Sequence, residues 1–577
     1  MRVAAIHARG FRNLDGRIPL SSKLAVLVGE NNAGKSNVID ACRLLFEAEA
    51  GPRGRRWITE DDFAHDGAGT RSTDSFELEA ELVDLDAGEQ ARMVTCLAPS
   101  LGPGWARLRL RARLRADGRV DTEWLGGDSD HPDLERWARE AVTFTYLHPL
   151  RDAASDLRPG RDNRLVALMS ALAPDGHADR ATIESIAEQA NQALDQVSAV
   201  RTAKDRVQDR LAALTGRGAL GQQADLVFAD PRFDRVVAAL RAMAGRITPL
   251  EIAENGLGYN NLLYMAVLLS ALAEETEAEL RVLLVEEPEA HLHPQLQDLL
   301  MRYLEEESGS ATQVIVTSHS PNFASAARVE RLTVLARPVP SAPIVARSPS
   351  DFGLTDIQLG HLRRFLDVTK ASLLFARGVM LVEGVAEQLL VPAVATQLGR
   401  PLSRSGVAVL NIGGVAFPPF AELFGPDKLP YRCAIISDGD PPKRPEAAGD
   451  GDADEADPGL SPVAAALAQR ESENLRVRLA QRTLEWDLAA AGNWDVLLEA
   501  LAAVKPRVAK RLAVDHANSD AHQRADALLA KVADRKGRFA QELVAVLEGG
   551  REFAVPAYLG EAIEWVTADQ NAAAVDE

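Results

Sequence analysis

Short apolar runs followed by stretches with helical periodicity recur along much of the chain, a pattern that is typical of α/β proteins. The first run, Leu24–Val28, passes through a glycine-containing loop into a helix-like stretch at Ser36–Phe46. Val282–Val285 and Val314–Val316 are further candidates for buried strands, with helical periodicity between them. Two such strands separated by a helix predict parallel β-α-β connectivity.

Alternation of polar and apolar residues marks a second kind of segment. Phe76–Leu82 and Ala106–Val120 follow this pattern, which predicts strands with one buried and one polar face. The polar positions of the second strand are arginines, namely Arg107, Arg109, Arg111, Arg113 and Arg115. Two interpretations of this arginine face stay open: a solvated edge that discourages aggregation, or a surface that contacts phosphate groups.

Helical periodicity dominates from Val166 to Ala244, and this segment contains no cluster of metal-ligating or nucleophilic side chains. We interpret it as an inserted helical region that serves dimerisation. A proline-rich linker near residues 338–343 precedes a second α/β unit, which begins near Val379–Val382. The pattern divides the chain into four regions, residues 1–165, 166–245, 246–345 and 346–577.

Composition narrows the class of protein. Hydrophobic residues make up 46% and charged residues 26% of the 577 residues, which is typical of a globular protein with several domains. The formal net charge of −20 argues against a protein that coats nucleic acid through bulk positive charge, but it leaves room for a local basic groove. The three cysteines include no CxxC pair, and no apolar stretch reaches the ~20 residues of a membrane span. We therefore expect a cytoplasmic protein without membrane contact.

The loop at Gly29–Ser36 (GENNAGKS) matches the phosphate-binding pattern GxxxxGKS in its required strand–loop–helix setting. Glycines allow backbone N–H groups to surround phosphate, Lys35 would pair with the β- and γ-oxygens, and Ser36 would ligate Mg²⁺. The sequence therefore predicts a nucleotide site. The residues assigned to it from this loop are Gly29, Asn32, Gly34, Lys35, Ser36 and Asn37.

Two later strand ends add acidic and imidazole side chains to this site. Glu286 and Glu287 end an apolar strand, where the first could hold Mg²⁺ and the second could orient an attacking water. His319 ends the next strand and could sense the γ-phosphate, with a purely structural histidine as the alternative. His291 and His293 have the spacing of a metal pair, but they directly follow the acids, where we expect an interface loop rather than zinc ligands.

A second cluster of acids follows strands of the last region. Glu383 ends one strand, Glu387 lies four residues on at the start of a helix, and Asp438 and Asp440 form a DxD pair at the end of another strand. Gly413–Gly414 lies between them in the sequence. Oxygen ligands that converge from neighbouring strand ends suit Mg²⁺ or Mn²⁺, and two ions can clamp both sides of a phosphodiester displacement. We predict a two-ion site, with solvated surface acids as the alternative.

Four segments resemble the ATPase head of the ABC group that contains RecF and the structural-maintenance-of-chromosomes proteins. They are Gly10–Leu14 (GFRNL), Gly29–Asn37 (GENNAGKSN), Glu286–Pro294 (EEPEAHLHP) and Val316–Pro321 (VTSHSP). In that group two heads sandwich ATP, and a signature loop of one head contacts the γ-phosphate on the other. Asn255–Asn261 occupies the signature position here but departs from the usual LSGGQ, and Glu286 stands where many relatives have Asp.

The order E-G-x-x-E, G-G and D-x-D in the last region resembles the Toprim metal-binding domain. An ABC head followed by Toprim resembles the OLD (overcoming lysogenisation defect) nucleases, including the A component of Gabija anti-phage defence. Further segments that look like that family are Tyr146–Asp152, Gly258–Tyr264, Thr483–Leu488 and Lys536–Ala540. The resemblance implies that Glu485 is a further acid near the metals and that Lys536 stabilises charge on the scissile phosphate. The alternatives are a helix-surface acid and an ordinary exposed lysine.

The resemblance implies an α/β fold with an ABC-type ATPase head at 1–165 and 246–345, a helical insertion at 166–245 and a Toprim nuclease domain with helical additions at 346–577. It implies an ATP-controlled, metal-dependent endonuclease that cuts or nicks double-stranded DNA, forms a homodimer or higher homo-oligomer, and serves anti-phage defence. The implied catalytic residues are Glu287, Glu383, Glu387, Asp438, Asp440, Glu485 and Lys536. Two alternatives stay open: a non-nucleolytic, ATP-gated DNA-repair scaffold of the RecF type, and a defence nuclease that needs a helicase partner.

Overall fold

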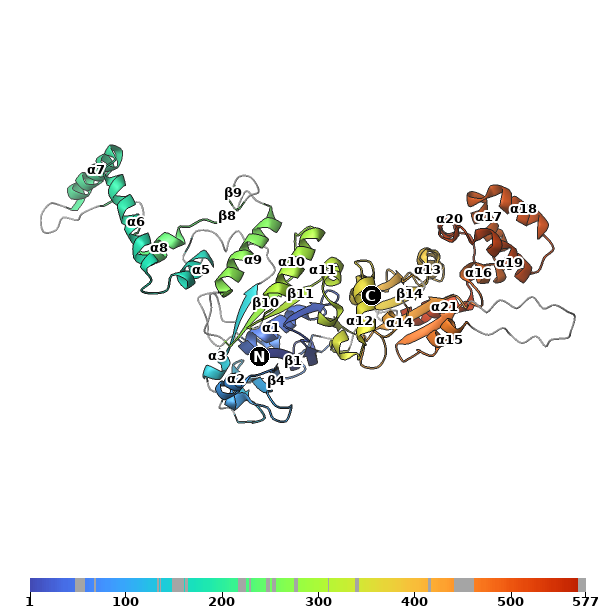
Figure 1. The fold of residues 1–577 in the computed structure, drawn as a ribbon, viewed down its shortest axis with the longest axis horizontal. Helices are drawn as coiled ribbons and strands as arrows, with labels where there is room; N and C mark the ends of the chain where they lie inside the picture. Colours follow the sequence, from blue (N-terminus) through green and yellow to red (C-terminus); the bar gives the residue numbers. More distant parts are fainter. Residues whose placement is uncertain are drawn as a thin grey trace.

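The computed structural model shows an elongated molecule (Figure 1). Helices α6 (Ala178–Asp195) and α7 (Ser198–Thr215) form one end, the C-terminal helices form the other, and the sheets lie between them. The structure describes residues 1–46, 58–66, 69–131, 134, 136–147, 160, 164–215, 225–227, 230–244, 250–251, 256–273, 279–309, 311–337, 342–413, 417–439 and 461–568. Within these ranges, no helix has both the length and the apolar character needed to cross a lipid bilayer.

The N-terminal region forms a five-stranded antiparallel sheet in the order β2-β1-β4-β5-β6. Its strands are β1 (Arg2–Phe11), β2 (Leu14–Pro19), β4 (Ser75–Val83), β5 (Ala106–Leu114) and β6 (Val120–Gly126). The prediction of a single strand over Ala106–Val120 is wrong, because the chain turns back after β5. Gly118 has a φ of +79° at this turn, and the N–H of Arg115 donates to the carbonyl of Arg119 at 2.8 Å.

The predicted arginine face lies on β5, which is an inner strand between β4 and β6, so the solvated-edge interpretation is wrong. Glutamates of β4 stand opposite these arginines. Arg111 donates to Glu77 at 2.6 Å, and Arg107 pairs with Glu79 at 3.2 Å. Cross-strand ion pairs therefore offset much of the positive charge on this face. Contact with phosphate groups stays a prediction.

A six-stranded sheet in the order β13-β12-β3-β11-β10-β7 contains the first predicted strands. Its strands are β3 (Leu24–Val28), β7 (Val142–Leu147), β10 (Leu280–Glu286), β11 (Thr312–Ser318), β12 (Leu332–Ala336) and β13 (Val345–Arg347). Strands β10 and β11 are parallel neighbours, which confirms the predicted connectivity. Strand β3 is buried on both faces, because α1 (Lys35–Phe46) covers one, and α9 (Leu257–Ala273) and α10 (Pro294–Glu307) cover the other.

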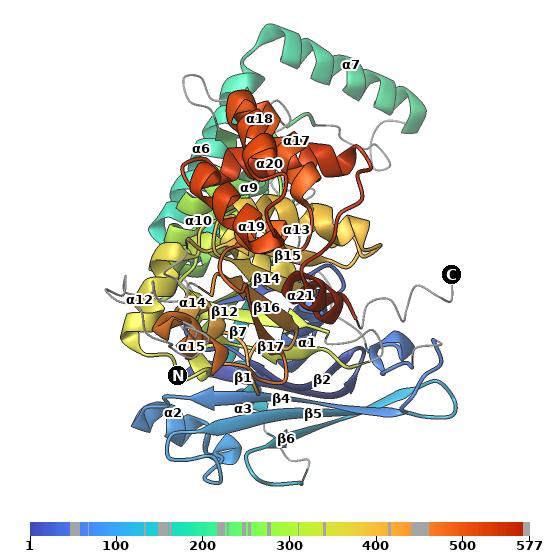
Figure 2. The same ribbon diagram turned by 90° about the vertical axis from the view of Figure 1, so that its right-hand side faces the viewer.

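Helices α5 (Arg164–Leu172), α6, α7 and α8 (Phe233–Ala238) occupy the region expected to be helical, although the boundaries of an insertion stay a prediction. Ala173, Phe233 and Val237 form a small apolar cluster at α5 and α8. Helix α7, which is described throughout its 18 residues, contains no buried residue. Figure 2 shows it projecting from the remainder of the molecule. Its role in dimerisation stays a prediction.

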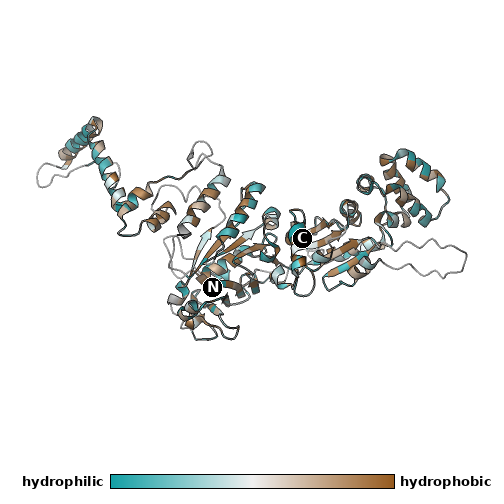
Figure 3. Ribbon diagram, viewed as in Figure 1, coloured by the Kyte–Doolittle hydropathy of each residue, from teal (hydrophilic) through white to brown (hydrophobic). Residues whose placement is uncertain are grey.

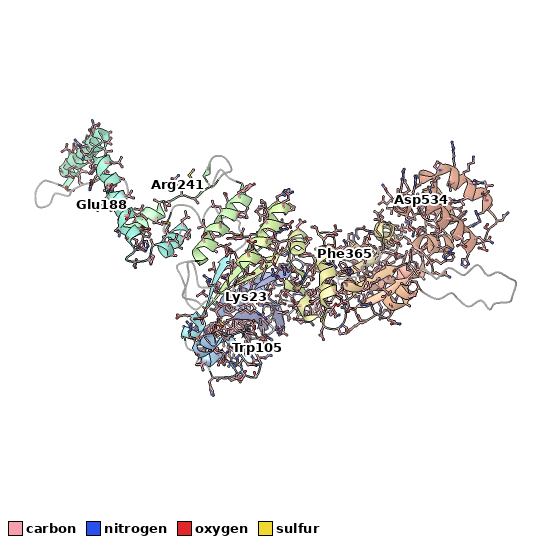
Figure 4. All side chains as sticks on the ribbon, viewed as in Figure 1. Lys23, Trp105, Glu188, Arg241, Phe365 and Asp534 are labelled. Carbon is pink, nitrogen blue, oxygen red and sulfur yellow. The ribbon has the colours of Figure 1, made fainter. Side chains whose placement is uncertain are left out.

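The last region contains a sheet of four parallel strands in the order β15-β14-β16-β17. The strands are β14 (Gly378–Val382), β15 (Val407–Asn411), β16 (Arg432–Ser437) and β17 (Leu475–Leu479). The surrounding helices are α13 (Val385–Gln397), α16 (Leu484–Ala490), α17 (Trp494–Val504), α18 (Pro506–Asp515), α19 (Ala521–Val532), α20 (Lys536–Glu548) and α21 (Ala557–Thr567). Figure 3 shows apolar residues gathered on the strands of both parallel sheets. Figure 4 labels Asp534 among the C-terminal helices.

Asn493 connects two parts of this helical group. Its amide nitrogen donates at 2.8 Å both to the carbonyl of Leu488, in α16, and to that of Ala554, ahead of α21. Its amide oxygen accepts from the N–H of Ala554 at 2.7 Å. Because Asn493 is buried, these backbone groups depend on it for their hydrogen bonds.

We expect Asn493→Ala to lower the free energy of unfolding of the C-terminal region by about 2–4 kcal/mol, because the backbone groups that it pairs stay buried without partners. Calorimetric melting of the full chain measures this loss. Asp495→Ala changes an exposed residue of α17 and is the matched control, which should melt nearly as the wild type does. Equal melting of the two variants would contradict the role of Asn493.

Candidate functional site

The phosphate loop between β3 and α1 has the backbone geometry that its glycines allow. Gly29 has a φ of +149° and Gly34 a φ of +79°, and Asn32 also adopts a positive φ of +62°. A Cβ atom on Gly29 would collide with the carbonyl oxygen of Leu335. A larger side chain at Gly29 would therefore displace the loop from β12, so glycine is needed for packing as well as for phosphate approach.

Lys35 is held across this loop as a buried cation. Its Nζ donates to the carbonyl oxygens of Gly29 and Glu30, both at 2.7 Å, and the residue is 4% exposed. Burial lowers the pKa of Lys35 to about 8, although the carboxylates of Glu287, Glu289 and Glu30 oppose that shift. A desolvated amine with only carbonyl partners gains strongly from an anionic ligand, which suits the β- and γ-phosphates.

A pocket of about 590 Å³ opens beside the loop. Its lining consists of Asn13, Asn31, Asn32, Ala33, Gly34, Lys35, Ser36, Asn37, Glu287 and His319. Arg12 supports this lining, because it donates to Asn37 at 2.6 Å and to Asp40 at 2.9 Å, while Asn37 donates to Asn13 at 2.6 Å. The GFRNL motif contains Arg12 and Asn13, but the sequence did not predict that they meet the phosphate loop.

The carboxyl ends of β10 and β11 bring Glu287 and His319 into the lining of this pocket, while Glu286 is buried at the end of β10. The Tyr146 hydroxyl donates to Glu286, and His319 Nε2 lies 3.0 Å from the carboxylate of Glu287. Glu287 has a φ of +44°, a left-handed conformation at the strand end. Burial, followed by the charge of Lys35, lowers the pKa of His319, which favours its neutral form. The structure thus places Glu286, Glu287 and His319 at one edge of the sheet.

Glu289 is a further acid here whose position sequence reasoning missed. Its Oε1 accepts from the Ser318 hydroxyl at 2.7 Å and from the N–H of His319 at 2.9 Å. Burial raises the pKa of Glu289. The residue therefore ties the loop after β10 to the end of β11. His293, by contrast, lies at the start of α10, where its Nδ1 accepts from the N–H of Gln295 at 3.5 Å.

Residues of the second predicted site gather at the carboxyl edge of the four-stranded sheet. Glu383 follows β14, Glu387 lies in the first turn of α13, and Asp438 follows β16. Helices α16 and α20 add Glu485 and Lys536 from their first turns. Asp440 and Gly414 lie outside the described residues.

Short contacts connect these side chains. Glu383 accepts from the Ser437 hydroxyl at 3.0 Å and from the N–H of Asp438 at 3.1 Å. Lys536 Nζ lies 3.0 Å from Glu485 and 3.8 Å from Asp438. Among the described residues, the carboxylate oxygens of Glu485 have no hydrogen-bond partner beyond this ion pair, although Glu485 is 1% exposed. The alternative of a helix-surface acid is therefore wrong for Glu485.

The acid cluster around Lys536 contains more negative than positive charge. Burial raises the pKa of Asp438 to about 8, and the carboxylates of Glu383, Glu387 and Glu485 add to the shift while Lys536 opposes it. Burial and Glu485 likewise raise the pKa of Glu387. Burial alone would lower the pKa of Lys536, but the surrounding carboxylates raise it. Two buried carboxylates (Glu387 and Glu485) and two partly buried ones (Glu383 and Asp438) around a single amine fit a divalent cation, which these four residues could hold.

The sequence does not predict a role for Asp487, whose carboxylate holds the backbone of the segment that packs next to Asp438. Its carboxylate accepts from the N–H groups of Gln481 at 2.7 Å and Arg482 at 3.2 Å. The carbonyl of Arg482 in turn accepts from the N–H of Gly439, next to Asp438, at 3.0 Å. The segment TLEWDL (483–488) contains both acids, and the family resemblance assigns a role to Glu485 alone.

Among the described residues, one group of three metal-type ligands has all its donor atoms within 4.8 Å of one another, and it lies elsewhere. It consists of His7, Glu79 and Glu81 on the antiparallel sheet. Arg107 pairs with Glu79 at 3.2 Å and Arg17 with Glu81 at 3.4 Å. These arginines supply the positive charge that the two acids need, unlike the acids around Lys536.

Comparison with known proteins finds two family matches and a curated relative. Residues 171–324 match an AAA ATPase domain, and residues 374–440 match the TOPRIM domain of overcoming lysogenization defect protein-like proteins. The chain is 25% identical over 438 residues to the OLD nuclease of Thermus scotoductus, which corresponds to 71% of this chain and 77% of that protein.

Two solved structures are also similar in part. The C-terminal region of the OLD protein of Xanthomonas campestris pv. campestris is 30% identical, covers 36% of this chain and 100% of its own, and has a TM-score of 0.26. The SMC head domain from Thermotoga maritima is 16% identical, covers 60% of this chain and 99% of its own, and has a TM-score of 0.30.

The family matches and the curated relative confirm the predicted resemblance to OLD nucleases. They also confirm an α/β protein with an ATPase part and a Toprim part. The narrower similarity to the A component of Gabija stays a prediction. So do the four domain boundaries, since the ATPase match at 171–324 includes both helical and strand segments.

We expect Lys35→Ala to weaken ATP binding by roughly 10- to 100-fold, because charge-assisted hydrogen bonds to phosphate of about 1.5–3 kcal/mol are lost. Calorimetric titration with ATP measures the affinity. Lys531→Ala removes an exposed lysine of α19 and should bind ATP as the wild type does. An unchanged affinity in the Lys35 variant would refute the role of this loop.

Proposed function

We propose that this chain is a metal-dependent DNA endonuclease of the OLD type whose cutting is controlled by ATP. The observation that carries the proposal is the group of buried carboxylates around Lys536 at the carboxyl edge of the Toprim sheet. Such a group needs cations, and cations at an open strand edge are suited to phosphodiester hydrolysis. The matches to a Toprim domain and to an OLD nuclease support the same chemistry.

We assign different roles to the carboxylates and to the lysine of this site. Glu383, Glu387, Asp438 and Glu485 would hold divalent cations, which activate water and stabilise the leaving oxygen when bound. Lys536 keeps its proton, because the carboxylates around it raise its pKa, and can therefore offset negative charge that develops on the scissile phosphate. The Ser437 and Asp438 contacts of Glu383 fix its orientation before substrate arrives.

In the nucleotide site, Lys35 and the loop from Gly29 would hold the phosphates of ATP, Ser36 and Glu286 would ligate its Mg²⁺, and Glu287 would orient water. We further propose double-stranded DNA as substrate, anti-phage defence as the biological role, a cytoplasmic location and a homo-oligomer. The projecting helix α7 supports the oligomer, because none of its described residues has a buried environment within this chain. A helicase partner is an additional candidate.

Contacts at the junction of the two parts support the proposed control by ATP. Arg377 donates to the carboxylate of Glu30, in the phosphate loop, at 2.8 Å. Arg377 directly precedes β14, and Glu383 directly follows it. In addition α11 (Pro321–Ala326), two residues after His319, packs against the short helix η6 (Lys370–Phe375) that leads into β14. Strand β14 therefore connects Arg377, which contacts the phosphate loop, with Glu383 of the proposed metal site.

We expect Glu383→Ala and Asp438→Ala to abolish cleavage of supercoiled plasmid in Mg²⁺ or Mn²⁺, because each removes a carboxylate that holds metal. Circular dichroism and ATP titration check that the fold is intact. Glu473→Ala, an exposed acid of the same domain, is the matched control and should cut normally. Cutting at the wild-type rate by either site variant would refute the assignment, and a wild-type protein that never cuts would favour the non-nucleolytic scaffold.

We expect Arg377→Ala to leave plasmid cleavage without nucleotide unchanged while the ratio of rates with and without ATP moves towards one. An exposed ion pair contributes at most about 1 kcal/mol, so ATP affinity should change by less than about fivefold. Cleavage rates measured across an ATP titration separate the two effects. Arg363→Ala, which removes an exposed pair with Glu330, is the control. A wild-type response to ATP in the Arg377 variant would contradict this coupling.

A further inference from the structure

One buried hydroxyl of the C-terminal region, that of Tyr558 in α21, is unpaired within the described part of the chain. The hydroxyl of Tyr558 is buried and has no hydrogen-bond partner among the described residues. Burial raises its pKa well above the usual value, and the charges of Asp487, Asp438, Glu387 and Glu485 raise it further. Buried polar groups in proteins are almost always satisfied by protein atoms or by ordered water. A buried donor without a partner, close to several carboxylates, therefore calls for an acceptor that bridges them.

The packing of α21 accounts for the position of Tyr558. Val566, near the end of this helix, lies against Gly378 at the start of β14, and the carbonyl of Trp565 accepts from Arg432 at the start of β16. Closer to its beginning, Glu561 pairs with Arg478 near the end of β17 at 3.0 Å. The helix therefore runs antiparallel to the strands, and its first turn lies at their carboxyl edge.

The lengths of helix α21 and strand β14 agree with this arrangement. The 11 residues of α21 rise about 16 Å, and the five residues of β14 span a similar distance of about 16 Å. Tyr558 is the second residue of the helix, so it lies towards the carboxyl edge of the strands, the edge where Glu383 and Asp438 follow β14 and β16. The Asn493 contact with Ala554 holds the segment that enters α21, which keeps the helix start in place.

The neighbouring carboxylates differ in their capacity to accept a further hydrogen bond. Asp487 already accepts from two backbone N–H groups, and Asp438 accepts from the first N–H of α16 at 3.1 Å. Both oxygens of Glu485 are buried without a hydrogen-bond donor among the described residues, apart from the ion pair with Lys536. Of the four acids whose charges act on Tyr558, Glu485 is therefore the one with buried carboxylate oxygens that lack a hydrogen-bond donor among the described residues, whereas no oxygen of Glu387 is in that state.

We infer that Tyr558 is a positioning residue of the Toprim site, whose hydroxyl orients the carboxylate of Glu485 through a buried water. The inference rests on the proposed function, because it deepens the same metal site. A water with the Tyr558 hydroxyl as donor and Glu485 as acceptor satisfies both groups at once. It also restricts the rotation of Glu485, so that less conformational entropy is lost when a cation binds.

A Tyr558→Phe variant tests this role in the full chain, because it keeps the ring that packs in the C-terminal core and removes the hydroxyl alone. We expect the dissociation constant for Mn²⁺, measured by calorimetric titration, to rise on the order of 10-fold. Plasmid cleavage should recover towards the wild-type rate at saturating Mn²⁺. Tyr431→Phe is the control: its buried hydroxyl donates to the carbonyl of Leu373 at 2.6 Å, so it should lower melting temperature without changing Mn²⁺ affinity.

A double-mutant cycle with Glu485→Gln distinguishes action through Glu485 from a general effect on the domain. In the Glu485→Gln background, adding Tyr558→Phe should change Mn²⁺ affinity by less than about twofold. Wild-type Mn²⁺ affinity in Tyr558→Phe, or the full loss persisting in the Glu485→Gln background, overturns the inference but leaves the nuclease proposal intact. Absence of Mn²⁺ binding and of cleavage by the wild-type protein contradicts both.

Discussion

Parallel strands that end at one edge of a sheet are the constraint on which both sites of this protein depend. Because neighbouring strands run in the same direction, the loops and helix starts that follow them meet at one edge of the sheet. Strands β3, β10 and β11 supply the nucleotide pocket in this way, and β14 and β16 supply the acid cluster. The chain therefore uses one geometric solution twice, once with glycine and amide donors and once with carboxylates.

Each site contains a lysine amine, which is buried at Lys35 and partly exposed at Lys536, and the net pKa shifts of the two amines have opposite directions. At Lys35 desolvation outweighs the nearby acids and lowers the pKa to about 8, so this loop gains most from an added anion. At Lys536 the surrounding carboxylates outweigh desolvation and raise the pKa, so this site gains most from an added cation. The balance of charge around each amine thus agrees with the proposed binding of phosphate at Lys35 and of metal near Lys536.

Features encoded in a short stretch of sequence were predictable. The phosphate loop and the strand-end acids belong to strand–loop–helix units, so their placement follows from local pattern. The ion pairs of the arginine face were not predictable, because only the sheet order shows that β5 is an inner strand opposite the glutamates of β4. Arg12 and Tyr558 were missed for the same reason, since each reaches its site from a distant part of the sequence. Sequence periodicity identifies the polar and apolar faces of a strand or helix. The side chains that contact those faces from other elements depend on tertiary packing.

The antiparallel course of α21 has a consequence for synthesis of the chain. About 180 residues separate Glu383 from the end of that helix, a length that a ribosome translates in about 10–40 s. At the start of this interval β14 and Glu383 exist, whereas β15, β16, β17 and the helices that carry Glu485, Lys536 and Tyr558 are still to be made. A nascent chain is therefore unable to assemble the complete acid cluster, which delays DNA cleavage until the C-terminal helices have folded.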